Sequence, residues 1–429
     1  MSTTAERFTH GLYAETACAA VVAPPLEGGE EADVVIVGGG YTGLSAALHL
    51  AERNIPAVVL EAEQPGQGAS GRNGGHVNPG LYVDPEGVIA KVGDTIGRRM
   101  LDMASSAPDF TFDLIERLGI DCEAQRKGTI RAGYHESWLP GIRGSLAQLE
   151  RSGSPARWID RDELCAVTGT SRYLGGIFFP QGGMVNPLSY ARGLAAGAAR
   201  AGARIHGGSR VTRVDWTGTR WRAATAGGSV VAKHVVLATN AHTDGLWPGL
   251  ARSVVPVWST IAATEPLGAA RLQTVMPGGS VLYETGLNTV YYRTDAGGRL
   301  LMGGRGVQRP ARSLGDASHL IAYAHRLWPV LDGARWTNVW NGKVAVTADK
   351  LIHLHEPAPG VIAALGYNGR GVALATAMGS VIARRIAGEP VADLPLPVTP
   401  IEGFPFRSLA PLGVQARLVY GRVRDRFGV

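Results

Sequence analysis

Three glycines in the pattern G-x-G-x-x-G, Gly38, Gly40 and Gly43, are followed by an acid, Glu61, at the distance that dinucleotide-binding units use. Gly38 permits a tight turn, Gly40 lets the backbone approach a pyrophosphate, and Gly43 lets a helix pack closely on a strand. Glu61 would accept hydrogen bonds from ribose hydroxyls. An accidental glycine turn is the alternative in a chain with 59 glycines. The spacing predicts a dinucleotide site.

The segments around these residues have the periods of a strand, a helix and a second strand. Residues 33–37 form a short apolar run rich in β-branched side chains, typical of a buried parallel strand. Apolar residues at helical spacing follow over residues 44–51. Residues 57–60 predict a second buried strand that ends at Glu61. The helix N-terminus would offer free N–H donors and a positive dipole end to a pyrophosphate.

Length and composition limit the class of protein. The chain has 429 residues, enough for two domains, and its hydrophobic content of 45% provides for a sizeable core. The net charge of +6 is scattered, which does not indicate nucleic-acid binding. The three cysteines are far apart, so no metal site or disulfide is expected, and the absence of a leader or a long apolar segment predicts a cytoplasmic protein without a transmembrane segment.

The rest of the chain predicts further helices and strands but no second dinucleotide-binding unit. With a single dinucleotide site and no reactive cysteine pair, a redox enzyme could not relay electrons between two such cofactors. Electrons taken from a substrate should therefore leave to oxygen, a quinone or another protein. A glycine-rich loop covers residues 64–80, and Val211 lies in a strand meander that often contacts an adenine. Helices are expected at residues 94–118, 137–151, 189–201, 316–329 and 372–387, and strands at 126–134, 174–179, 203–241, 254–307, 338–346 and 360–364.

Three motifs in a fixed order resemble a known family. They are GASGRNGG at residues 68–75, VVLATNA at 235–241 and GYNGRG at 366–371. Together with the first unit they resemble the D-amino-acid oxidase/glycine oxidase superfamily of FAD enzymes. GASGRNGG and YYR…GRLLMGG further resemble its γ-glutamylputrescine oxidase branch, which is close to the pipecolate oxidases. The resemblance covers nearly the whole chain.

The resemblance implies an α/β fold, with a Rossmann-like FAD-binding domain and an α+β substrate domain built on a large antiparallel sheet. The FAD-binding domain would be discontinuous. Residues 1–125, 181–255 and 342–400 would form it, and residues 126–180 and 256–341 would form the substrate domain. Residues 401–429 form a C-terminal tail, and its basic residues indicate that it docks on the protein or contacts an anionic membrane.

The resemblance also implies which residues hold FAD and which lie near the substrate. The expected cofactor contacts are Gly38, Gly40, Tyr41, Thr42, Gly43, Glu61, Ala62, Gly68, Ala69, Ser70, Arg72, Asn73, Gly74, Gly75, Val211, Ala238, Thr239, Asn240, Gly342, Gly366, Asn368, Gly369, Arg370 and Gly371. The expected catalytic or substrate-binding residues are Arg72, Asn73, Tyr292, Arg293 and Arg305. Strand alternation sends Tyr292 to one face of its sheet and Tyr291 and Arg293 to the other.

Two departures from relatives shape the expected chemistry. Residues 340–349 lack the cysteine that tethers FAD in sarcosine-oxidase relatives, so FAD should be non-covalent. Leu301 and Ala373 stand nearest to the lysines that bind substrate and activate oxygen in those relatives. The expected activity is oxidation of an amine or amino-acid C–N bond, with oxygen or a quinone-like acceptor. The substrate, the oligomeric state and the role of His76 stay open.

Overall fold

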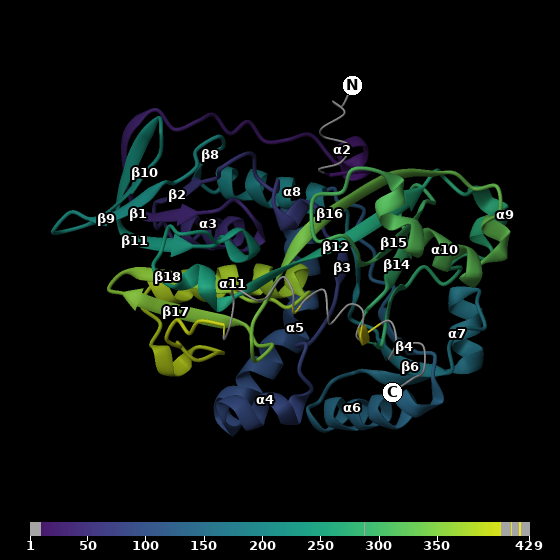
Figure 1. Ribbon diagram of the computed structural model, residues 1–429. Helices are drawn as coiled ribbons and strands as arrows, with labels where there is room; N and C mark the ends of the chain where they lie inside the picture. The colour runs from purple at the N-terminus through teal and green to yellow at the C-terminus, as the bar shows by residue number, and fades with distance from the viewer. Residues whose placement is uncertain (1–9, 287, 405–412, 414–419, 422–429) are drawn as a thin grey trace.

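The computed structural model describes residues 10–286, 288–404, 413, 420 and 421. Its strands form two sheets of eight strands each, which lie side by side with helices around them (Figure 1). A small two-stranded sheet pairs β3 (His76–Val77) with β7 (Gly183–Met184). Within the described part of the chain, no helix is both long and apolar enough to cross a membrane.

The first sheet has a parallel centre built on the dinucleotide-binding unit. Val34, Val35 and Ile36 in its first strand are fully buried, as expected for a strand covered on both faces. The parallel strands are, in spatial order, β18 (Val361–Leu365), β11 (Gly228–Leu237), β1 (Gly28–Val37), β2 (Ala57–Leu60) and β8 (Arg204–His206). Antiparallel additions are β17 (His353–Ala358) beside β18, β10 (Trp221–Ala224) beside β11, and β9 (Arg213–Trp216) beside β10.

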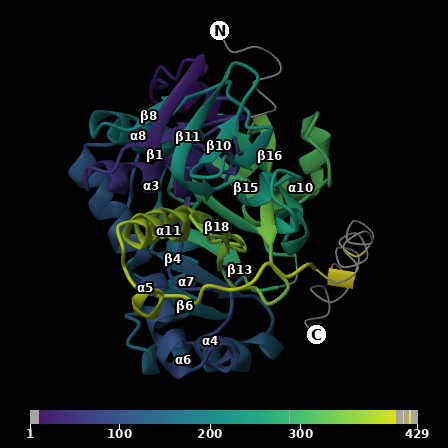
Figure 2. The same cartoon turned by 90° about the vertical axis from the view of Figure 1, so that its left-hand side faces the viewer.

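Helices of small residues cover this sheet. α3 (Tyr41–Ala51) follows β1, and α11 (Gly371–Ile386) packs against it and against α5 (Asp94–Leu118), as Figure 2 shows. A Cβ on Gly379 of α11 would lie 2.4 Å from Cβ of Ser45, so this crossing requires the smallest side chain. α8 (Pro187–Arg200) also packs on α3, and α4 (Pro85–Val92) packs on α5.

The second sheet is antiparallel except for one parallel pair, β13 with β4. Its strands are, in order, β16 (Trp336–Val346), β12 (Val255–Thr264), β15 (Leu300–Arg305), β14 (Tyr291–Thr294), β13 (Val281–Glu284), β4 (Thr129–Gly133), β6 (Gly175–Phe179) and β5 (Arg157–Asp160). The helices α6 (Leu139–Arg151), α7 (Arg161–Thr168), α9 (Gly268–Leu272) and α10 (Ser318–Leu327) accompany it, and α2 (Tyr13–Thr16) lies near β16. One face holds a core around Trp328 and Tyr292.

The predicted α/β fold class is confirmed, and most predicted elements are present. α5 has the predicted bounds, because its apolar face gives a strong helical period. The first strand begins earlier than expected, at Gly28, because β1 continues to pair with β11 from Gly28↔Gly228 onward. The helix expected over residues 316–329 is shorter, since its N-terminal turn is 3₁₀ and Trp328 leaves the helical conformation. Most of the tail at 401–429 lies outside the described residues.

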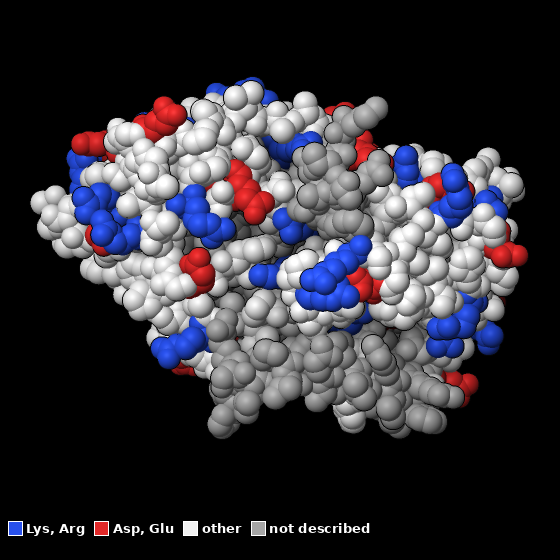
Figure 3. All heavy atoms as spheres, turned by 45° about the horizontal axis from the view of Figure 1, so that its top comes forward, with Lys and Arg blue, Asp and Glu red and all other residues white. Residues whose placement is uncertain are grey.

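Charged side chains are interspersed on the face shown in Figure 3. Lys and Arg alternate there with Asp and Glu and with uncharged residues. On this face the positive net charge is therefore not gathered into one basic patch.

Candidate functional site

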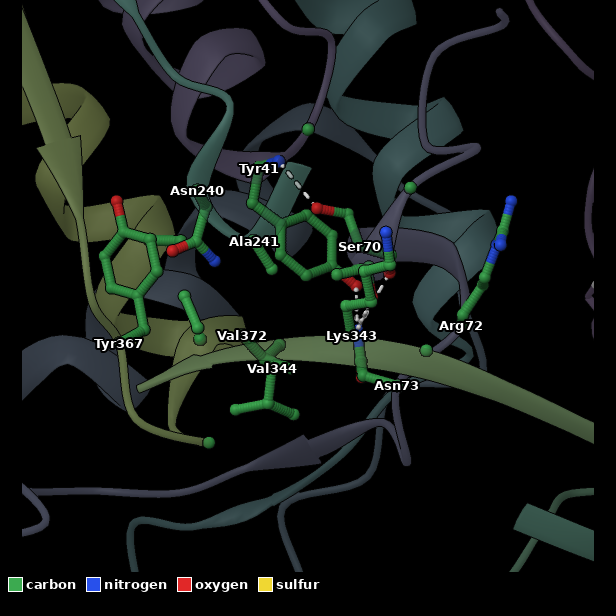
Figure 4. A pocket seen from close by; sticks show the side chains of 18 of the residues that line it. Tyr41, Ser70, Arg72, Asn73, Asn240, Ala241, Lys343, Val344, Tyr367 and Val372 are labelled. Carbon is green, nitrogen blue, oxygen red and sulfur yellow. Dashed lines mark hydrogen bonds between the residues drawn. The ribbon is translucent and has the colours of Figure 1, made fainter. Parts of the chain in front are cut away.

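A cavity of about 530 Å³ extends from the carboxyl ends of β1 and β2 to one face of the second sheet. Figure 4 shows side chains from α3, the loop at residues 68–75, β16 and the loop at 366–371 around one space. Parallel α/β sheets bind ligands at this edge, where the strands end and the helices begin.

The three motif glycines have the close approaches that their pattern predicts. Gly38 has φ of +110°, and a Cβ there would lie 3.0 Å from the carbonyl oxygen of Ala238. A Cβ on Gly43 would lie 2.0 Å from the carbonyl oxygen of Gly38, so α3 packs directly on the turn. Gly38 and Gly40 line the cavity, whereas Gly43 lies beneath it.

Glu61 lies at the end of β2 with its carboxylate turned toward the glycine turn. It accepts hydrogen bonds from the backbone N–H of Gly39 at 2.7 Å and of Glu63 at 3.0 Å. Burial raises the pKa of the Glu61 carboxyl, and these two N–H donors oppose that shift. The side chain lines the cavity beside Ala62 and Val211.

The loop at residues 68–75 is held in shape by its own polar side chains. The Asn73 amide donates to the carbonyl oxygens of Ser70 at 2.8 Å and Ala69 at 3.2 Å, and its oxygen accepts from the N–H of Gly75 at 2.8 Å. Ser70 Oγ accepts from the N–H of Tyr41 at 3.0 Å, which ties the loop to the first turn of α3 (Figure 4).

Arg72 carries positive charge to the same cavity. Its Nε is buried and has no hydrogen-bond partner among the described residues, and burial lowers the pKa of its guanidinium. A buried donor without a partner indicates a place for an acceptor on a ligand.

The second loop, residues 366–371, is fixed by Asn368. This residue has φ of +50°; its side-chain oxygen accepts from the N–H of Thr347 at 3.0 Å, and its amide donates to the carbonyl oxygen of Leu351 at 3.2 Å. α11 begins at Gly371 without a side-chain cap, so its first N–H groups and positive dipole end lie at the cavity.

The second sheet contributes Tyr291, Arg305 and Ser259 to the cavity. The Tyr291 hydroxyl lies 3.0 Å from Ser259 Oγ, and burial raises the pKa of Tyr291 to about 12. The His76 ring meets the Tyr291 ring edge-on at 5.3 Å. Burial, with the nearby Arg293 cation, lowers the pKa of His76 to about 3, so this imidazole is neutral at physiological pH.

Two residues predicted for the substrate pocket, Tyr292 and Arg293, do not line it. Tyr292 points to the opposite face of the sheet, where its ring meets Trp328 at 5.1 Å and its hydroxyl bonds that of Tyr173. Arg293 shares the face of Tyr291 but lies one row further along the strand, beneath the 68–75 loop. Strand alternation predicts which face of the sheet a side chain takes, but not whether another segment covers that part of the face.

Of the other residues predicted to contact the cofactor, most line the cavity and a few do not. The structure brings Tyr41, Thr42, Gly68, Ala69, Asn73, Gly74, Ala238, Thr239, Asn240, Gly342, Gly369 and Arg370 to the cavity. Gly75 and Gly366 do not line it. Each is packed against other parts of the protein. A Cβ on Gly75 would lie 2.1 Å from the Val185 carbonyl oxygen, and a Cβ on Gly366 would lie 2.3 Å from Thr347 Cγ2.

Several charged lining residues were missed from the sequence. Leu301 and Ala373 are buried in the core, but Lys343 lines the cavity from β16, next to the predicted Gly342. Its Nζ lies 5.3 Å from the centre of the Trp258 ring. Arg131 and Asp84 also line the cavity. Arg131 lies within a predicted strand, but no local pattern predicts that this strand adjoins β13.

The described residues contain no group of three side chains suited to hold a metal ion. His353 and His355 stack on one another at 5.5 Å, and His353 is bound by Asp349 at 3.1 Å. The donor set of the cavity suits an organic dinucleotide instead. It offers a glycine turn and an uncapped helix start for phosphates, a carboxylate for a ribose, and two polar loops beyond.

Comparisons with known proteins agree with this geometry. Residues 33–385 match the DAO family, FAD dependent oxidoreductase. A probable oxidoreductase OrdL of Rhizobium meliloti (strain 1021) is 31% identical over 413 residues, covering 95% of each chain. The γ-glutamylputrescine oxidoreductase of Escherichia coli (strain K12) is 31% identical over 403 residues, covering 92% of this chain and 93% of that protein. The glycine oxidase structure from Geobacillus kaustophilus superposes with a TM-score of 0.74 at 25% identity, covering 87% and 100%.

The chain therefore belongs to the DAO family of FAD-dependent oxidoreductases. Its cofactor is FAD, and the predicted enzyme class, which acts on C–N groups, is confirmed. The cysteines Cys18, Cys122 and Cys165 do not line the cavity.

Proposed function

We propose that this protein oxidises the C–N bond of an amine or amino acid to an imine, which water then converts to an aldehyde or ketone. The proposed substrate is a γ-glutamylputrescine-like polyamine derivative or a secondary amino acid. Oxygen would accept the electrons and be reduced to hydrogen peroxide. The observation that carries the proposal is the continuous cavity from the Gly38–Glu61 cradle to Tyr291 and Arg305 on the second sheet. The similarity to γ-glutamylputrescine oxidoreductase supports it.

FAD, when bound, supplies the acceptor for the hydride that leaves the amine-bearing carbon. The protein then needs to hold the substrate and exclude water. The half-buried Tyr291 and the buried His76 line one wall of the cavity, and the neutral His76 ring adds no positive charge that would repel an ammonium. Arg305, on the adjoining strand, is the candidate partner of a substrate carboxylate.

Several positively charged groups line the cavity. Arg72, Lys343, Arg370 and the N-terminus of α11 all reach it. Fixed cations and a helix N-terminus favour a ligand that becomes more negative during the reaction. These groups would therefore stabilise the electron-rich form of a cofactor held between the loops.

A second candidate keeps the oxidation of the amine but passes the electrons to a quinone or a carrier protein. The burial of Leu301 and Ala373 in the core favours it, because neither position supplies a cation to the cavity. Lys343 favours oxygen, since it brings an ammonium to the cavity from another strand.

Mixing the protein with a panel of amines in the absence of air tests the proposal. A substrate should bleach the oxidised flavin absorption, and air should restore it with formation of peroxide. Recovery only with an artificial quinone would favour the second candidate. Rapid bleaching by NADH or NADPH, without a response to any amine, would contradict both. Acid precipitation should leave the FAD in the supernatant, as expected for a non-covalent cofactor.

We also propose the domain division expected from the sequence. Residues 1–125, 181–255 and 342–400 would form the FAD-binding domain, and residues 126–180 and 256–341 the substrate domain. All strands of the first sheet fall within the former ranges, which supports the division. In the second sheet, β16 crosses the boundary at residue 342.

A further inference from the structure

His76 is a buried histidine in the wall of the cavity, directly after the 68–75 loop. Its side chain is 9% exposed, and its strand pairs with β7 at Met184. Its ring meets the Tyr291 ring edge-on, and a Cβ on Gly74 would lie 3.4 Å from His76 Cδ2. The imidazole is therefore held between the 68–75 loop and the second sheet, with little freedom to turn away from the cavity.

The His76 ring keeps an unused capacity for hydrogen bonding. Its Nε2 is buried and has no hydrogen-bond partner among the described residues. The hydroxyl of the neighbouring Tyr291, by contrast, already lies 3.0 Å from Ser259 Oγ. A neutral imidazole carries one N–H and one lone pair, so one ring nitrogen can accept a hydrogen bond. A ligand that donates to this ring would recover the free energy that an unpaired buried polar atom costs.

The charges around His76 suit a neutral amine better than an ammonium. Besides burial, the charge that lowers the pKa of His76 is that of Arg293 on β14. Arg72 from the 68–75 loop and Arg305 from β15 also line the cavity. The described residues of β7, and those of α11 that line the cavity, are uncharged. Nearby cations favour loss of a proton from an ammonium, so an amine bound at His76 is expected to be neutral.

We propose that His76 is a catalytic residue whose neutral imidazole accepts a hydrogen bond from the N–H of the reacting amine, an inference that rests on the proposed amine oxidation. This bond would hold the amine nitrogen beside Tyr291 and leave the nitrogen lone pair unprotonated. The C–H bond then breaks with both electrons, which leave with the hydrogen as a hydride, and the lone pair forms the C=N bond of an iminium.

No proton has to move in this step, so His76 acts as an acceptor of a hydrogen bond and not as a base. The amine nitrogen gains positive charge as the hydride leaves, and its N–H becomes a stronger donor. The hydrogen bond to His76 is therefore stronger in the transition state than with the bound substrate, which lowers the barrier.

Anaerobic stopped-flow reduction by the fastest amine of the panel tests this role. His76→Leu removes the acceptor at similar volume, and the limiting rate at saturating amine should fall about ten- to a hundred-fold. His76→Gln supplies a neutral acceptor oxygen and should recover part of the rate. The pH profiles of the wild-type protein and His76→Gln should have the same shape. A titration near pH 6.5 in the wild-type protein that is missing in His76→Gln would identify a base and overturn the proposal.

His355→Leu is the matched control. The His355 side chain is 2% exposed and its Nε2 is also buried without a partner, but it does not line the cavity. Its loss should leave the rate of flavin reduction unchanged. FAD content and melting temperature establish that each variant is folded.

The wild-type protein provides a second measurement that remains informative if His76→Leu fails to fold. The N,N-dimethyl form of the same amine has no N–H to donate when it is neutral, so it should reduce the flavin at least ten-fold more slowly. In His76→Leu or His76→Met the two amines should differ less, as a double-mutant cycle requires of an interaction that has been removed. Equal rates for the two amines in the wild-type protein would overturn the proposal.

Binding separates this inference from the proposed function. The probe is the α,α-dimethyl analogue of each amine, which cannot lose a hydride, and its Kd comes from the perturbation of the flavin spectrum. If amines reduce the flavin of His76→Leu as fast as that of the wild-type protein, the role of His76 is wrong and the oxidation stands. If no amine reduces the flavin, the oxidation is wrong. In that case a Kd that rises in His76→Leu and recovers in His76→Gln supports the hydrogen bond, and an unchanged Kd or no binding overturns it.

Discussion

At the scale of single residues, Glu61 combines two tasks. Its carboxylate holds the N–H groups of Gly39 and Glu63, and it lines the cavity where a ribose is expected. Burial raises the pKa of this carboxyl, so a charged Glu61 costs free energy that a further hydrogen-bond donor would offset.

Glu61→Ala should weaken FAD binding because it removes this acceptor. A buried polar partner left unpaired costs about 1–3 kcal/mol, which is at least several-fold in Kd. Titration of the apoprotein with FAD, followed by flavin fluorescence, measures the change. Glu52→Ala, at a surface ion pair with Arg117, should leave the affinity as it is. Unchanged affinity in Glu61→Ala would assign Glu61 to the turn alone.

Arg293 shows the difference between a binding and a positioning residue. It is 2% exposed, and its guanidinium donates to the carbonyl oxygens of Gly74 at 2.7 Å and Val185 at 3.3 Å and to the Tyr13 hydroxyl at 3.3 Å. It therefore fixes the base of the 68–75 loop from below.

Arg293→Met should lower stability and FAD retention, because each buried acceptor left unpaired costs about 1–3 kcal/mol. Arg305→Met should instead raise KM for a carboxylate-bearing amine, because Arg305 lines the cavity. Thermal unfolding and steady-state kinetics on both variants distinguish the two roles. A raised KM without loss of stability in Arg293→Met would return Arg293 to the substrate pocket.

At the scale of elements, the start of α3 controls the cradle. Gly43 sits in the first turn of this helix and touches the turn that follows β1. Any side chain there must move the helix, since the obstructing atom is the backbone oxygen of Gly38, which cannot rotate away.

Gly43→Ala should therefore reduce FAD occupancy and the melting temperature, although alanine favours helices over glycine by about 1 kcal/mol. Gly144→Ala is the matched control, because Gly144 lies within α6 with no atom within 4 Å of a Cβ. It should stabilise the protein slightly or leave it unchanged. Equal effects of the two substitutions would mean that α3 shifts at no cost.

The dinucleotide-binding unit could be predicted from the sequence because its signals are local. A strand, a glycine turn, a helix and an acid follow each other within one short stretch. The substrate end could not be predicted as well. Tyr291 and Arg293 share a face, but only the loop that crosses above Arg293 decides which row is open. Arg131 depends on a pairing between β4 and β13, which are far apart in the chain.

At the scale of the whole molecule, a buried neutral histidine makes stability depend on pH. Burial, with the nearby Arg293 cation, lowers the pKa of His76 to about 3, from an ordinary value of about 6.5. Between these values the unfolded chain binds more protons than the folded one. Stability is therefore full above pH 6.5 and falls as the pH is lowered.

Urea unfolding at pH 7 and pH 5 should show this loss. His76 contributes up to about 1.4 kcal/mol per pH unit within this window. His76→Asn should flatten the dependence on pH, since asparagine does not titrate. His135→Asn, at a half-buried position that does not line the cavity, is the control for the loss of a histidine side chain. A slope that stays the same in His76→Asn would show that His76 is not the group that titrates.

The order of strands also dictates when the protein can acquire its cofactor during synthesis. β1 pairs with β11, and the register joins Val34 to His234, 200 positions later in the chain (234 − 34). At about 5–20 residues per second, a ribosome needs roughly 10–40 s to make that stretch. Throughout this interval one edge of β1 lacks its neighbour, and the loop at 366–371 that closes the cavity emerges later still. We therefore expect FAD to bind only after residues 366–371 have been made, near the end of translation.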